Sequence, residues 1–165
     1  MLKKIHEDYL RSLMFGLQDG LVSTTGVVVG ISTGISEKEI IVLAAFVAVT
    51  VEATSMAAGQ YSSEKAVHQK MDKVGKHTDS LIAGALIMFF SYLAGGAVPI
   101  FPTLVFNQPE ARYLAVVFSL IGLFTVGLIK GKIVEHRPLR SAIELFIIGI
   151  IATTIGIVVG QILKI

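Results

Sequence analysis

The sequence predicts an all-helical, polytopic membrane protein with five transmembrane helices in a single domain, residues 1–165. Hydrophobic residues make up 53% of the chain and charged residues only 16%, whereas a soluble domain carries roughly 25% charged residues. The charges are also unevenly placed, because they collect in short segments between long apolar stretches. This pattern is typical of bilayer spans joined by short polar loops.

Five stretches are long and apolar enough to cross ~30 Å of hydrocarbon, which takes ~20 residues of helix. They lie at residues 12–33, 40–61, 80–106, 111–130 and 141–163. Residues 36–39 form a short charged turn between the first two spans. Pro109 follows the third span and is placed to start the next helix. The segment before the fifth span is basic and contains Pro138.

The distribution of Lys and Arg predicts the orientation of the chain. The N-terminal segment carries three of these residues, and the stretches 62–78 and 130–140 carry four each. The opposite side has only Lys38, Arg112 and Lys164. Cytoplasmic loops are enriched in Lys and Arg, so we expect a cytoplasmic N-terminus and a C-terminus outside. An odd number of spans satisfies this orientation.

Composition excludes several classes of protein. The chain has no cysteine, which removes disulfides, thiolate metal sites and Cys nucleophiles. Its net charge is +2 and it has no basic patch large enough for nucleic acid. The N-terminus does not resemble a cleaved signal peptide, because residues 1–11 are polar and Asp19 interrupts the apolar run after them. The spans contain no HExxH, GxSxG or aspartyl-dyad pattern, so no enzyme is expected.

Two acidic residues lie inside predicted spans, Asp19 in the first and Glu52 in the second. An acid near the bilayer centre costs roughly 2.5–3.5 kcal/mol, so such residues usually face a protein interior, a water-filled path or a cation. Met56 and Gln60 follow Glu52 at intervals of four residues, on the same side of a helix. A carboxylate with a thioether suits a borderline or soft divalent cation. The alternatives are a hydrated Asp19 near the interface, a protonated Glu52 bound to hydroxyls, and a Met56 that only packs.

The polar stretch after the second span continues this spacing with Glu64, His68 and Asp72. If the second helix extends beyond the membrane, the three side chains share one face and could collect a metal ion before it enters the bilayer. The alternative is a solvated helix face interleaved with lysines.

Glycines and prolines add two further signals. Gly16 and Gly20, and then Gly26, Gly30 and Gly34, are spaced by four residues, which lets helix backbones approach closely within one chain or between subunits. Gly156 and Gly160 repeat this spacing in the fifth span. The third span contains Pro99 and Pro102, which indicate either irregular backbone lining a cavity or a helix that ends early.

Two motifs resemble the vacuolar iron transporter family, including its nodulin-like branch. The first is Phe15-Gly-Leu-Gln-Asp19-Gly-Leu-Val-Ser-Thr24, which is similar to that family's Asp-Gly-Leu motif in the first helix. The second is Ser55-Met56-Ala-Ala-Gly-Gln60-Tyr61, which is similar to its Ser-Met-x-x-Gly-x-Tyr motif at the end of the second helix. The resemblance covers nearly the whole chain.

The resemblance implies a five-helix homodimer that exports Fe(II), and often Mn(II), from the cytosol in exchange for protons. It also implies that Asp19 and Met56 line the translocation path near the dimer axis. The chain departs from the family in having only residues 62–78 where vacuolar members carry a cytosolic metal-binding domain. Ala48 stands where some members have a second-helix Glu, and we infer that Glu52 substitutes for it. Nodulin-like members often have Glu at the position of Gln60.

The sequence therefore predicts a proton-coupled divalent-metal transporter with no resident cofactor. Its partners are divalent metal ions, the lipid bilayer and a second copy of the chain, with no nucleic acid. The predicted metal-binding residues are Asp19, Glu52, Met56, Gln60, Glu64 and His68. The alternative function is a non-transporting membrane scaffold or regulatory subunit. We expect a multi-pass protein of the cell membrane, with the vacuolar membrane as the alternative.

Overall fold

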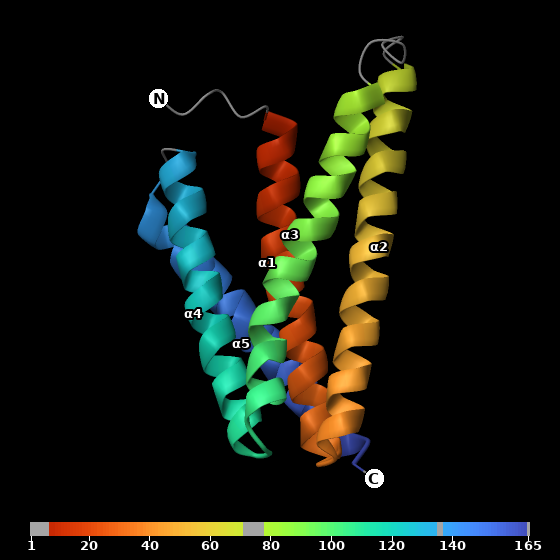
Figure 1. The fold of residues 1–165 in the computed structure, drawn as a ribbon. Coiled ribbons are helices and arrows are strands. Elements are labelled where there is room, and N and C mark those ends of the chain that lie inside the picture. Colours follow the sequence, from red (N-terminus) through yellow and green to blue (C-terminus); the bar gives the residue numbers. More distant parts are fainter. Residues whose placement is uncertain (1–6, 71–77, 135–136, 165) are drawn as a thin grey trace.

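The computed structural model describes residues 7–70, 78–134 and 137–164. Within these ranges the chain forms five α-helices (Figure 1): α1 (Glu7–Gly34), α2 (Lys38–Lys70), α3 (Thr78–Val105), α4 (Glu110–Ile133) and α5 (Pro138–Ile162). Each is long and apolar enough to cross a membrane, which confirms the all-helical, polytopic fold class. Each predicted span overlaps one helix, and α2 continues to Lys70, well past residue 61.

α1 is the central helix, because it packs against all four of the others. α2 packs additionally on α3, and α4 packs on both α3 and α5. In Figure 1, α2 lies on one side of α1 and α4 lies on the other. The beginning of α1 lies at one end of the bundle and the chain's C-terminus at the other. The middle of α1 therefore lies close to the middle of the molecule.

The outer helices bury narrow stripes of mostly small residues. α4 and α5 each bury six residues, at intervals of three or four: Ala111, Ala115, Ser119, Leu123, Gly127 and Gly131, and Ala142, Leu145, Gly149, Thr153, Gly156 and Gly160. Their other faces carry large exposed hydrophobic side chains, such as Ile121 at 60% and Ile151 at 53% exposure. A continuous apolar exterior of this kind is unusual for a soluble monomer and suits lipid contact.

The glycines of α1 serve contacts within the chain. Gly16 and Gly20 lie against α3, and Gly30 and Gly34 lie against α5. A Cβ atom added to Gly30 would lie 3.2 Å from the carbonyl oxygen of Gly156. The intrachain interpretation of the four-residue spacing is confirmed for these contacts, which small residues permit by close backbone approach. The subunit-interface interpretation stays a prediction.

The two prolines of the third span lie inside α3, which continues through them to Val105. Both side chains are fully buried. The alternative in which this helix ends early is therefore wrong. A proline removes one backbone donor and frees a carbonyl one turn earlier, which is tolerated at membrane depth when the backbone is buried in protein.

Replacing Gly156 by Ala should lower the free energy of unfolding by roughly 1–3 kcal/mol, as overpacking does in a tight contact. The added Cβ would lie 2.6 Å from the carbonyl oxygen of Gly26, and both groups belong to helix backbones that have no room to move. Unfolding of the purified protein by a denaturing detergent, followed by circular dichroism, measures the effect.

The matched control is Gly59→Ala, because nothing lies within 4 Å of the position that its Cβ would take. This change should stabilise α2 by about 0.5–1 kcal/mol, since glycine is the more flexible residue when unfolded. Equal free energies of unfolding for the two variants would contradict the α1–α5 contact.

Candidate metal-binding site

The two intramembrane acids come from neighbouring helices. Asp19 lies near the middle of α1 and Glu52 near the middle of α2, and both side chains are partly buried. Their carboxylates are close enough to interact electrostatically. Two negative charges held together in a protein interior repel each other unless a cation or a proton lies between them. The two acids therefore supply the kind of side chain that a cation site needs, on two neighbouring helices.

A third helix holds Glu52 in place. Ser23 Oγ on α1 donates a hydrogen bond to Glu52 Oε2 at 3.1 Å. The hydroxyl of Tyr92 on α3 donates to the same oxygen. The Ser23 and Tyr92 hydroxyl oxygens also lie against each other, and each hydroxyl has a single proton to donate. Tyr92 is 1% exposed. Hydrogen bonds to an ionised acceptor are stronger than neutral ones, so this network fixes one carboxylate oxygen of Glu52.

Met56 lies one turn after Glu52 on α2 and is partly buried. It packs, together with Phe89 and Leu93, against a cluster of buried residues that includes Tyr92 and Ala53. The thioether is thus beside the Glu52 network and also part of the hydrophobic packing. Methionine combines both roles easily because its side chain is flexible and its sulfur polarisable.

Gln60, Glu64 and His68 lie farther along α2, and they line a cavity of about 410 Å³ at the end of the bundle. Gln60 Nε2 donates to Ser12 Oγ on α1 at 3.1 Å and also to Glu64 Oε1. Arg11 on α1 pairs with the same Glu64 oxygen at 2.6 Å. The expected extension of α2 beyond residue 61 is present, and Asp72 lies outside the described residues.

The six predicted residues thus form two groups, one in the middle of the bundle, where Asp19 of α1 joins Glu52 and Met56 of α2, and one at the end of α2. In the part of the chain that the structure describes, no three His, Asp or Glu side chains are placed to hold one metal ion together. The central group offers two carboxylates and a thioether, which is a partial coordination sphere. Mixed oxygen and sulfur donors favour borderline transition metals over Mg²⁺ and Ca²⁺.

Sequence reasoning missed two residues of the central group, Ser23 and Tyr92. Ser23 lies one turn after Asp19, so its spacing could have indicated it. Tyr92 is an isolated tyrosine in an apolar span, and only the packing of α3 against α1 and α2 brings its hydroxyl to Glu52. A buried Tyr hydroxyl usually finds a partner, and this one has two.

Comparison of the sequence with known proteins identifies a family that matches most of the chain. The VIT family matches residues 10–83 and 66–161, which is most of the chain. Vacuolar iron transporter 1 of rice is 36% identical over 73 residues, 44% of this chain. Vacuolar iron transporter 1 of Arabidopsis thaliana is 31% identical over 84 residues, 50% of this chain. An uncharacterized protein of Methanocaldococcus jannaschii is 28% identical over 90% of this chain and 86% of its own length.

The matches differ in extent. The chain spans only 29% of the rice transporter and 34% of the Arabidopsis transporter. The match to the Methanocaldococcus protein extends over nearly all of both chains. Similarity to the plant transporters is therefore local, and similarity to the archaeal protein is global.

Replacing Tyr92 by Phe should lower the free energy of unfolding by about 1–3 kcal/mol, the usual effect of removing one hydrogen-bond partner from a polar group inside a protein. The ring would keep its packing, while Glu52 would lose one of its two hydroxyl partners. The control is Tyr113→Phe, because Tyr113 is 63% exposed. Detergent-induced unfolding measures both variants, and equal effects would contradict the Glu52 network.

Proposed function

Because the chain belongs to the VIT family, we propose that it is a proton-coupled transporter that moves divalent metal, Fe(II) and also Mn(II), out of the cytosol. The family is one of transporters and not of enzymes. The observation that carries the proposal is the presence of two partly buried acids, Asp19 and Glu52, near the middle of two neighbouring helices of membrane length. A pair of acids is costly in a membrane, and cation transport is a function that requires it.

The donor atoms support a transition metal as the substrate. Asp19 and Glu52 supply hard oxygen ligands, and Met56 supplies a soft sulfur one turn from Glu52. Mg²⁺ prefers oxygen donors and keeps its water ligands, so it gains little from the thioether. Fe(II) and Mn(II) accept such mixed donors more readily.

The same carboxylates support proton coupling. A carboxylate must be deprotonated to bind a metal, so metal and protons compete for Asp19 and Glu52. Metal bound from one side would leave when protons arrive from the other. Asp19 is the freer of the two, since no hydrogen bond to its carboxylate is formed among the described side chains, whereas Glu52 is held by Ser23 and Tyr92.

The cavity at the end of α2 supports an entry route from the cytosol. Gln60, Glu64 and His68 line it, and it lies on the side that the Lys and Arg distribution predicts to be cytoplasmic. Arg11 forms an ion pair with Glu64 there, and an arriving cation would compete with the guanidinium for that carboxylate. Export then runs from this cavity to Asp19 and Glu52 and on to the opposite end.

We propose further that the transporter is a homodimer of the cell membrane. One chain supplies two carboxylates and one thioether, fewer than the about four to six donors that a divalent transition metal takes. A symmetric second copy would complete the set.

Replacing Asp19 by Asn should reduce Fe(II)-driven proton flux in proteoliposomes by at least about tenfold, a loss typical even of outer-shell changes at metal sites. The amide keeps the size of the side chain and loses the charge that binds both metal and proton. Flux is followed with a pH-sensitive dye trapped in the vesicles.

Glu144→Gln is the control, because Glu144 is 58% exposed on α5 and pairs only with Arg140 among the described residues. It removes one carboxylate far from the proposed path and should leave flux unchanged. Full metal flux in the Asp19→Asn variant would refute the proposed function.

Replacing Met56 by Leu should lower Fe(II) flux several-fold and leave Mg(II) flux unchanged or raised, because only the soft ligand is lost. Leu fills nearly the same volume, so the packing against Phe89 and Leu93 is kept. Met14→Leu on α1 is the matched control. Competition between the two ions in the same vesicles measures the ratio, and an unchanged ratio would remove Met56 from the path.

A further inference from the structure

A second polar cavity, of about 500 Å³, lies at the opposite end of the bundle from His68. It is formed where α1 and α5 end and where α2 and α4 begin. Its lining includes Ser36, Asn107 and Gln108, and three cationic residues, Lys38, Arg112 and Lys164. The proposed transport mechanism uses none of these residues.

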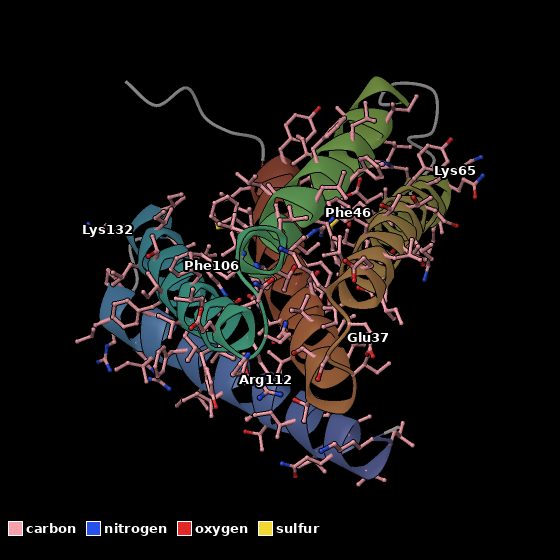
Figure 2. All side chains as sticks on the ribbon, turned by 60° about the horizontal axis from the view of Figure 1, so that its bottom comes forward. Glu37, Phe46, Lys65, Phe106, Arg112 and Lys132 are labelled. Carbon is pink, nitrogen blue, oxygen red and sulfur yellow. The ribbon has the colours of Figure 1, made fainter. Side chains whose placement is uncertain are left out.

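The three cations are the ones that the sequence separates from all other Lys and Arg residues. They come from three distant parts of the chain and converge on one cavity. None of them pairs with a carboxylate in the described ranges. Their acidic sequence neighbours, Glu37, Glu39 and Glu110, are exposed and do not line the cavity. Figure 2 looks onto this end and shows Arg112 among the helices and Glu37 at the outer edge.

Helix capping explains only part of this arrangement. Arg112 Nη1 donates to the carbonyl oxygen of Ser32 at 3.0 Å and lies 3.4 Å from Thr33 Oγ1, so it caps the end of α1. A guanidinium has five N–H donors, which leaves others for a ligand. Lys38 opens α2, and a cation is unfavourable at the positive end of a helix dipole. The ends of α1 and α5 favour Arg112 and Lys164, so Lys38 and the remaining donors of Arg112 are the groups that an anion would satisfy.

We propose that this cavity binds a phosphate group, presented by an anionic lipid headgroup or by free phosphate. Lys and Arg are the usual partners of phosphate oxygens, and Arg can bind two of them at once. Gln108 Oε1 is buried at this site and accepts no hydrogen bond within the described part of the chain. A lipid glycerol hydroxyl or the proton of a monohydrogen phosphate would supply the missing donor. The cavity lies at the helix ends, at the level of the headgroups.

Two binding measurements on the purified full chain distinguish the two sources. The first is the melting temperature in neutral detergent with increasing inorganic phosphate, against sodium chloride of equal ionic strength. The second is native mass spectrometry of the protein with phosphatidylglycerol, against phosphatidylcholine. We expect a saturable rise in melting temperature, retention of one phosphatidylglycerol per chain, or both.

The test variant is Lys38→Gln with Lys164→Gln, which leaves the capping role of Arg112 intact. Each lysine near a membrane surface contributes about fivefold to the binding of an anionic headgroup, so the double variant should bind at least about tenfold more weakly. The control is Lys65→Gln with Lys132→Gln, which removes two exposed lysines that Figure 2 shows well away from Arg112. Circular dichroism checks that both variants are folded.

The outcomes separate the possibilities. A rise in melting temperature with phosphate alone identifies a free anion as the ligand, and retention of phosphatidylglycerol alone identifies a lipid. In either case the Lys38 and Lys164 variant must lose the effect and the control variant must keep it. Binding of neither probe to the natural chain would overturn the proposal. Equal binding by the two double variants would overturn it as well, because attraction to positive charge in general would then suffice.

Discussion

The close approach of α1 to α3 and α5 is the contact on which the remaining structure depends. In a bilayer the hydrophobic effect does not drive helices together, so their association rests on van der Waals packing between smooth surfaces and on polar contacts. Gly20 lies directly against the backbone carbonyl of Tyr92, and Gly30 lies against Gly156. With its backbone this close to two neighbours, α1 can contact every other helix.

This contact also creates the central polar network. Because Gly20 brings α1 against α3 at Tyr92, the tyrosine hydroxyl reaches Ser23, which lies one turn farther along α1. Both hydroxyls then bind Glu52 from α2. A carboxylate removed from water is strongly destabilised unless donors replace the lost hydration. Glu52 receives two such donors and Asp19 receives none from the described residues, so the two acids differ in environment although they share one site.

The sequence predicts much of this architecture because the bilayer constrains it. Five apolar stretches and the loop charges are sufficient to predict the number of spans. Asp19 and Glu52 can be recognised because acids are rare in membranes. The part that sequence could not predict depends on packing between helices. Tyr92 becomes a partner of Glu52 through the rotation of α3, and the continuity of α3 through Pro99 and Pro102 depends on the burial of both prolines.

The two ends of the bundle differ in charge, because polar and acidic residues follow α2 at one end and three cationic residues line a cavity at the other. Glu52, Gln60, Glu64 and His68 follow one another along α2 at multiples of four residues, and each is partly buried. Four residues turn an α-helix by about 40° beyond a full turn, so this polar series winds gradually around α2. It leads from the cavity near His68 to the centre of the bundle.

Beyond the centre, the three cations around Arg112 line the other end. Unpaired, they would repel a divalent cation that approached them, because charges partly buried in protein are poorly screened by salt. A bound phosphate would offset one or two of the three positive charges and so weaken the repulsion that a departing ion meets. Anion binding in this cavity would therefore lower the electrostatic barrier at this end of the bundle while the three positive side chains are retained.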